Sequence, residues 1–150
     1  MKSVIQKQYL HKINQLLELP AIDRPPEGWV RTFRKALGMS SRQLAARLNL
    51  SKPSVTQMER MEAEDRITLT QLRKVAQALD AKLIYALVPR HSLDTVLSEQ
   101  AKRKAEQLVA RADIQMQLEK QQLGQKDISQ LIKEEAQRLL NSMPRDFWDE

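Results

Sequence analysis

Apolar residues return at steps of three and four positions over most of this chain, the spacing of amphipathic helices. This pattern predicts seven helical stretches, at about residues 4–19, 29–37, 40–48, 51–61, 68–79, 92–123 and 127–140. The segment Leu83–Val88 departs from it, because it is a short, almost continuous apolar run that stops at Pro89. We therefore expect a mainly α protein with one short β-strand.

Residues 40–61 predict two short helices joined by a tight turn. Ser40 and Gln43 have the spacing of a reciprocal capping pair, and Ser51 has the side chain of a helix cap. Between them, Asn49 tolerates the left-handed conformation that a sharp turn requires. The second helix leaves polar side chains facing outward, which is how a helix-turn-helix reads the major groove of DNA.

The helix at 29–37 is expected to pack beneath this pair. Its predicted buried stripe consists of Trp29, Val30, Phe33 and Leu37. Its basic residues, expected to face outward, are Arg31, Arg34 and Lys35. The charged stretch from Glu62 to Arg66 is expected to be a loop, where Arg66 either contacts phosphate or is simply solvated, and the glutamates Glu62 and Glu64 are interpreted as solvated.

The apolar run after this domain has two interpretations. As a strand it lacks a second strand within the chain, so it would pair with its copy in a second chain through Leu83, Ile84, Tyr85 and Leu87. Alternatively, it is a helix that joins the four predicted within residues 29–79 and completes their core. The first interpretation predicts a homodimer.

These patterns divide the chain into three parts. Residues 1–27 are an amphipathic helix and a proline-rich connector, residues 28–89 the helix-turn-helix domain with the short strand, and residues 90–150 a helical C-terminal region. The N-terminal helix either covers the core of the domain or contacts DNA or a partner. At the other end, Phe147 and Trp148 either fold back onto their own chain or occupy a pocket of a partner.

Charge changes the picture more than length does. The chain has 150 residues and a net charge of +6, but residues 1–90 hold 16 Lys and Arg against 8 Asp and Glu, a net +8. Residues 127–150 hold 3 against 6, a net −3. A basic region favours a polyanionic partner through counterion release, and solvation alone is the simpler explanation.

Several function classes find no support in the residue types. The chain has no cysteine, three glycines and two isolated histidines, so we expect no metal, no cofactor and no enzymatic activity. It lacks an apolar run of about 18 residues and the apolar core of a signal peptide. We therefore expect a soluble, cytoplasmic protein that does not contact membranes.

The runs GMSSRQLAARLNLSKPSVTQMER and ITLTQLRKVAQALD resemble the helix-turn-helix of phage Cro and repressor proteins. More of the chain resembles the family called mobile mystery protein A, through RPPEGWVRTFRKALGMS, LIYALVPRHSL and QAKRKAEQLVAR. Members of that family are encoded beside a Fic-domain protein. The resemblance implies a regulator or antitoxin with a Fic-domain protein as its partner.

The Cro-like resemblance also implies roles for individual residues. The side chains at the start and on the groove side of the recognition helix would read bases; these are Ser51, Lys52, Pro53, Thr56 and Gln57. Other polar and basic side chains would contact DNA phosphates; these are Arg34, Lys35, Ser41, Arg42, Arg60 and Arg66. Glu59 would be structural, because it often pairs internally in such domains.

Residues 95–100, TVLSEQ, resemble all but the last position of a Fic-inhibiting helix, which would make Thr95 and Glu99 contacts to the partner enzyme. The function expected from all these features is a dimeric, sequence-specific repressor of its own operon, acting on a near-palindrome with half-sites about 10 bp apart. The alternative is an interaction protein whose C-terminal helices neutralise the enzyme, with DNA binding secondary.

Overall fold

The computed structural model describes residues 3–118 and 125–150 and divides the chain into two compact units. One unit is continuous, Pro20–Tyr85. The other combines the N-terminal residues up to Leu19 with the chain from Ala86 to Glu150. This differs from the expected three-part division, because the N-terminal helix groups with the C-terminal helices.

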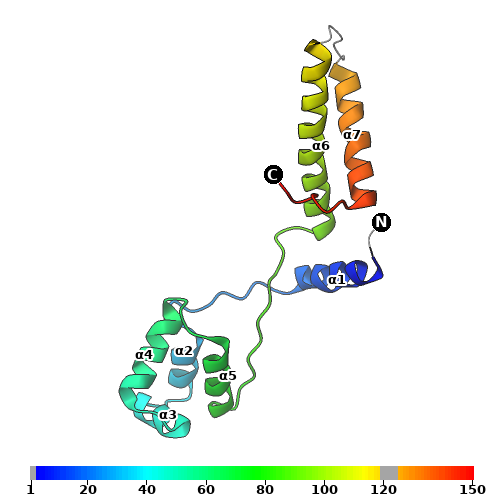
Figure 1. The fold of residues 1–150 in the computed structure, drawn as a ribbon. Helices are drawn as coiled ribbons and strands as arrows, with labels where there is room; N and C mark the ends of the chain where they lie inside the picture. The colour runs from blue at the N-terminus through cyan, green and yellow to red at the C-terminus, as the bar shows by residue number, and fades with distance from the viewer. Residues whose placement is uncertain (1–2, 119–124) are drawn as a thin grey trace. The chain divides into compact units, whose positions relative to one another are not determined.

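Four helices form the Pro20–Tyr85 unit (Figure 1): α2 (Trp29–Ala36), α3 (Ser41–Leu48), α4 (Lys52–Ala63) and α5 (Leu69–Ala78). Helices α3 and α5 pack against each other, and α2 contacts both α4 and α5. The buried apolar side chains come from all four helices and the end of α5; they are Val30, Leu44, Ala45, Val55, Met58, Val75 and Leu79. This small core fixes α4 against its neighbours.

The caps that the sequence predicted are present. Ser40 Oγ accepts from the Gln43 amide at 3.1 Å, and Gln43 Oε1 accepts from the Ser40 amide at 2.8 Å. Asn49 ends α3 with φ 55°, in the left-handed region, and Ser51 caps α4. The predicted helix, turn and helix are therefore confirmed in the local backbone.

The predicted buried face of α2 is wrong for three of its four residues. Val30 is buried, but Trp29, Phe33 and Leu37 are 46%, 38% and 56% exposed. Arg34, which the sequence placed outside, is 8% exposed and lies one turn after Val30. Helix α2 is thus rotated about its axis relative to the prediction, because Glu59 of α4 pairs with Arg34 in the interior.

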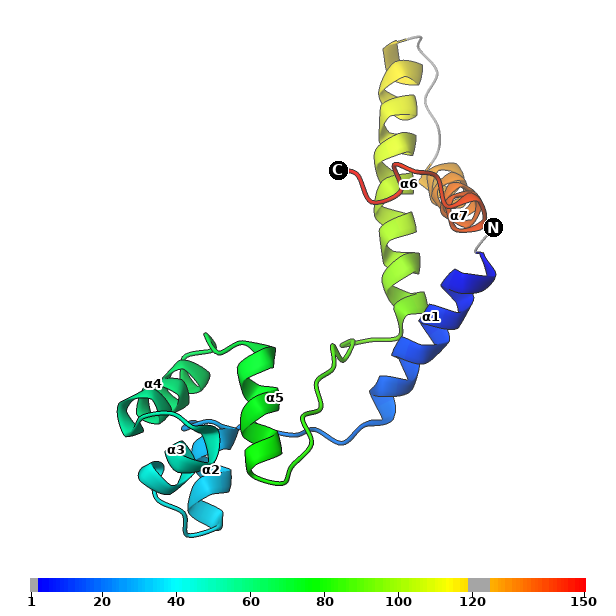
Figure 2. The ribbon, with the colours of Figure 1, turned by 60° about the horizontal axis from the view of Figure 1, so that its bottom comes forward.

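The second unit contains α1 (Val4–Asn14), the short 3-10 helix η1 (Gln15–Glu18), α6 (Leu93–Leu118) and α7 (Gln125–Ser142). Helices α6 and α7 lie side by side in both views (Figures 1 and 2). Their shared core consists of Leu97, Ala101, Ala105, Leu139 and Phe147. Small alanines on α6 let α7 and the C-terminal residues approach closely.

Helix α1 joins this second unit through one side chain in particular. The Leu93 amide donates to Asn14 Oδ1 at 2.9 Å, and Asn14 Nδ2 donates to Asp94 Oδ2 at 3.2 Å. Leu10 packs against the same apolar cluster. The expectation that α1 covers the core of the helix-turn-helix domain is therefore corrected: it contacts α6.

Residues 83–88 form neither the predicted strand nor the alternative helix. A strand needs a neighbour to accept and donate its backbone hydrogen bonds, and no strand is present in the described parts of this single chain. Ile84, Tyr85 and Leu87 are 78%, 63% and 91% exposed. The segment is an apolar connector between the two units.

The long helices α6 and α7 are described up to and after a gap at residues 119–124. The described part of α6 ends at Leu118, and the rest of the predicted helix, up to residue 123, lies outside the described residues. The described part of α7 begins at Gln125, before the expected start at residue 127, and the helix ends at Ser142 instead of residue 140.

Candidate nucleic-acid interface

Helix α4 has two chemically different faces. Its inner face carries Val55, Met58, Glu59 and Glu62, each 9% exposed or less. Its outer face carries five exposed side chains, namely Lys52, Pro53, Thr56, Gln57 and Arg60. The outer face is thus polar and basic along the length of the helix.

The five residues predicted to read bases differ in how free their polar atoms are. Ser51 Oγ accepts from the Ser54 amide at 3.3 Å and lies 2.7 Å from Ser54 Oγ, so it serves mainly as a cap. Thr56 Oγ1 donates to the Lys52 carbonyl at 3.2 Å. Within the described ranges, no hydrogen bond or ion pair holds the side chains of Lys52 and Gln57. These two have their full hydrogen-bonding capacity available.

The structure corrects the role expected for Arg34. Its Nε and Nη2 donate to the Glu59 carboxylate at 2.6 and 3.2 Å, and Nη1 donates to the Met39 carbonyl at 2.8 Å. The hydrogen bond to Glu59 raises the pKa of Arg34 above its ordinary value. Arg34 therefore links α2 to α4, and its buried guanidinium is not available to contact a DNA phosphate. The internal pairing expected of Glu59 is confirmed.

The other predicted phosphate contacts remain on the surface. Lys35 Nζ lies 3.0 Å from a Glu27 carboxylate oxygen, Arg60 Nε lies 3.7 Å from Glu64, and Arg66 also pairs with Glu64. Exposed ion pairs of this kind contribute roughly 0–1 kcal/mol each, so a phosphate can replace the carboxylate at little cost.

Two further candidates come from the first turn of α3. Arg42 is exposed and has no ion-pair partner in the described part of the chain, whereas Ser41 is half-buried. Both stand at the N-terminus of a helix, where the backbone amides also favour an anion. Arg42 is therefore the phosphate candidate that needs no rearrangement.

Sequence reasoning missed Glu62, which was expected to be solvated. Its side chain is buried, and its carboxylate accepts from the backbone amides of Trp29 and Val30 at 2.9 and 2.8 Å. It caps α2 because the N-cap position is Gly28, which has no side chain to do so. A glycine directly before a helix was the signal that a remote residue supplies the cap.

Gly28 is required by this arrangement for two reasons. Its φ of +88° is a conformation that side-chain-bearing residues rarely adopt, and an added Cβ would lie 2.7 Å from Glu62 Oε1. Arg24 strengthens the same junction by donating to the Glu62 carbonyl and pairing with Asp65 at 2.9 Å. The end of α4 is thus tied to the start of α2.

The predicted partner contacts of the second unit have different fates. Thr95 and Glu99 are exposed on α6. Phe147 is 1% exposed and belongs to the core, so it folds back onto its own chain. The C-terminal residues are held there because Gln100 Nε2 donates to the Phe147 carbonyl at 2.8 Å. Trp148 is 54% exposed and contacts the Phe147 ring edge to face.

Comparison with known proteins adds one finding. Residues 30–85 match the family model described as Helix-turn-helix, so this part of the chain is a helix-turn-helix domain, a class of DNA-binding regulatory domain. The match covers α2 to α5 and the first residues of the connector. No curated protein and no solved structure matches the chain.

Two other kinds of site are not seen in residues 3–118 and 125–150. No group of three His, Asp or Glu side chains there is placed to hold a metal ion. None of the helices in these ranges is both long and apolar enough to cross a membrane.

Proposed function

We propose that this protein is a sequence-specific DNA-binding regulator that places α4 in the major groove. The observation that carries the proposal is the outer face of α4, where Lys52 and Gln57 are exposed and uncommitted while the inner face is locked to α2 by Glu59 and Glu62. A helix presented in this way reads bases without reorganising its own domain.

The chemistry of the two side chains assigns their roles. Gln57 can pair bidentately with adenine, and Lys52 can donate to guanine, with each good pair contributing about 1–3 kcal/mol of discrimination. DNA phosphates would be bound by side chains that lie within this helix or near it in the sequence, namely Arg42, Ser41, Lys35, Arg60 and Arg66. Two residues would then read bases, and several would set the position of the protein along the DNA.

A gel-shift titration on the DNA upstream of the coding sequence tests this assignment. The double variant Lys52→Ala, Gln57→Ala should bind its specific DNA site roughly 30-fold more weakly or worse, because two side-chain contacts to bases are lost. The matched control is Lys102→Ala, Gln107→Ala, which removes the same residue types at the same spacing from the exposed surface of α6. Equal affinity of the two double variants would refute the assignment.

A salt titration separates the phosphate contacts from base reading. Arg42→Ala should lower the slope of log affinity against log salt concentration by about 1 and weaken binding to all sequences alike. An unchanged slope would remove Arg42 from the interface, without affecting the assignment of Lys52 and Gln57.

We also propose that two copies pair through residues 83–88. Four apolar side chains here are exposed, and no backbone hydrogen bond among the described residues engages the amides of Leu83–Val88. An antiparallel pair with Tyr85 opposite its own copy would place Leu83 opposite Leu87 on the same face. Such a dimer suits a near-palindromic operator with half-sites about 10 bp apart.

The chain has no cysteine, so single-cysteine variants test this register cleanly. Under mild oxidation Tyr85→Cys should form a disulfide-linked dimer quickly, and Ile84→Cys, whose copy would lie diagonally, should form one slowly. Sedimentation of the unmodified protein provides the independent measurement. A monomer at high micromolar concentration would rule out the paired strands.

The resemblance to mobile mystery protein A supports a finer proposal: autorepression of an operon shared with a Fic-domain protein, and an antitoxin role. Neutralisation of that enzyme by the C-terminal helices is the second candidate function, favoured by the exposure of Thr95 and Glu99 on α6. Co-purification with the neighbouring gene product tests the partnership. Glu99→Ala should release the enzyme from inhibition, whereas Glu106→Ala, an exposed glutamate of the same helix, should not.

A further inference from the structure

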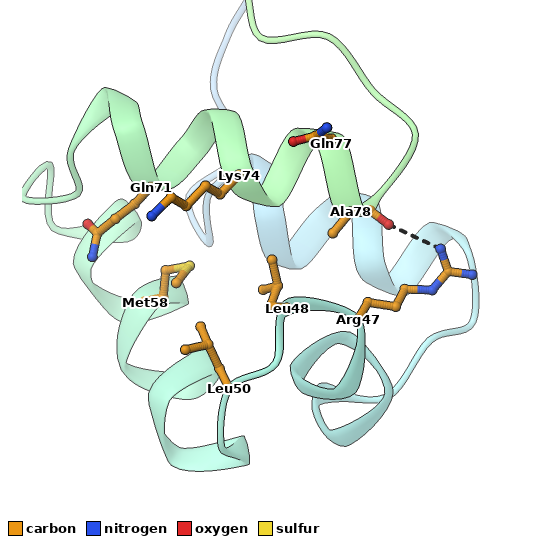
Figure 3. A pocket seen from close by; sticks show the side chains of 8 residues that line it. All are labelled: Arg47, Leu48, Leu50, Met58, Gln71, Lys74, Gln77 and Ala78. Carbon is orange, nitrogen blue, oxygen red and sulfur yellow. Dashed lines mark hydrogen bonds between the residues drawn. The ribbon is translucent and has the colours of Figure 1, made fainter.

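A pocket of about 450 Å³ lies within the helix-turn-helix domain, between the turn that joins α3 to α4 and the helix α5 (Figure 3). Its apolar part is formed by Leu48, Leu50 and Met58, whose side chains point into the space beneath α5. Leu50 is 43% exposed although it is a large apolar residue. An apolar ligand group in the pocket would cover it.

The charged lining is entirely cationic. Arg47 and Lys74 line the pocket, and no acidic side chain does. Arg47 Nη1 donates to the Ala78 carbonyl at 3.1 Å, the contact drawn in Figure 3, which leaves its other N–H groups available. In the described part of the chain Lys74 has no ion-pair partner. The two cations lie at different ends of the pocket in Figure 3, with Lys74 on the side of Gln71 and Arg47 beside Ala78. Lys74 is thus the free cation, and a cation beside an apolar surface is the complement of an amphiphilic anion.

The helix ends around the pocket restrict the charge of that anion. Leu48 is the last residue of α3 and Ala78 the last of α5, so the carbonyl ends of two helices border the same space. These ends carry partial negative charge and oppose a group with two full charges, such as a phosphate. A singly charged carboxylate is the better match to the one free ammonium, that of Lys74.

We propose that this pocket binds a small organic monocarboxylate with a short apolar chain. The carboxylate pairs with Lys74, and the chain covers Leu50 and Met58. Because Leu50 directly precedes the cap of α4, the ligand contacts α3, α4 and α5 together and stabilises their arrangement. The site does not depend on the proposed DNA-binding function, and its test uses no DNA.

The test is an NMR titration of the full-length, isotopically labelled chain with hexanoate. Acetate supplies the charge without the chain, and 1-hexanol supplies the chain without the charge. Hexanoate should shift the amides of Leu50, Gln71 and Ala78 and bind roughly five times more tightly than either analogue. Hexanoate should also raise the melting temperature, because it binds only the folded state.

Lys74→Gln should weaken hexanoate binding about three- to fivefold and leave the affinity for 1-hexanol unchanged. Lys82→Gln is the control, since Lys82 is an exposed lysine that does not line the pocket. The proposal is overturned if hexanoate shifts amides elsewhere, binds no better than 1-hexanol, or binds Lys74→Gln as well as the unmodified protein.

Discussion

The two units of this protein hold their helices together by different chemistry. In the Pro20–Tyr85 unit, three charged side chains are buried among the apolar ones: Arg34, Glu59 and Glu62. In the other unit, the buried residues of the described ranges are all apolar, and Phe147 fills the space above the alanines of α6. The first core holds its helices in defined orientations through polar contacts, whereas the second is held together mainly by apolar burial.

The two kinds of core constrain their helices differently. Apolar contacts are non-directional, so a core made only of them tolerates small shifts between helices. Hydrogen bonds between Glu59 and Arg34, and between Glu62 and the start of α2, allow one orientation of α4. The base reading proposed for α4 depends on this orientation.

The largest expected effect comes from breaking the buried ion pair. Glu59→Ala leaves Arg34 buried without its partner and should lower the free energy of unfolding by roughly 3–5 kcal/mol, measured by urea titration. Replacing both residues, by Arg34→Met with Glu59→Leu, should recover more than half of that loss, because no buried charge remains. A loss below 1 kcal/mol in the single variant would contradict the contrast between the two cores.

The second unit should respond to a change of volume instead of charge. Phe147→Ala should cost about 3 kcal/mol, and Trp148→Ala, at a 54% exposed position, less than about 1 kcal/mol. The two tryptophans provide separate reporters, since Trp29 lies in one unit and Trp148 in the other. In Phe147→Ala, the Trp148 fluorescence transition should move and that of Trp29 should stay. Equal costs at both positions would show that Phe147 is not part of the core.

A smaller effect is expected at the junction of α2 and α4. Gly28→Ala should cost about 2 kcal/mol, because the added methyl group meets the Glu62 carboxylate and the backbone is in a region reserved for glycine. Gly38→Ala is the matched control: its φ is also positive, at +65°, but its surroundings are open. That variant should cost only about 1 kcal/mol. The difference between the two combines the contact with Glu62 and the backbone strain at Gly28, where ψ is 163°, so it should shrink but not vanish in a Glu62→Ala background.

The smallest effect concerns acid stability, to which each unit contributes one surface carboxylate. A hydrogen bond from Lys35 lowers the pKa of Glu27 below its ordinary value of 4.5, and a hydrogen bond from Arg138 does the same for Glu135. A lowered folded pKa means that the stabilisation is complete above pH 4.5 and is lost as the pH falls through the folded value. Glu27→Gln should therefore flatten the acid limb of the Trp29 transition, and Glu135→Gln that of the Trp148 transition. Unchanged acid limbs would show that these pairs do not contribute.

Local signals in the sequence predicted most of the helix-turn-helix domain. Ser40, Gln43, Asn49 and Ser51 act within a few residues of themselves, so their capping and turning roles follow from the order of residues alone. The exposed polar face of α4 follows in the same way, because its inner residues return at helical spacing.

Long-range contacts explain where the prediction failed. The rotation of α2 depends on Glu59, 25 residues away from Arg34, and the cap of α2 depends on Glu62. Hydrophobic spacing treats charged residues as outward-facing and so misplaces a charge whose partner is far along the chain. The same limit applies to α1, because its contact with α6 joins residues about 80 positions apart in the chain.

The sequence by itself determined the helices, the turn at Asn49 and the side of α4 that faces outward, because each depends on neighbours in the chain. Only the tertiary structure decided that Arg34 is an internal link, that Glu62 caps a distant helix, and that Phe147 belongs to the core. The physical reason is that burial of a charge or an aromatic ring depends on partners that folding brings together.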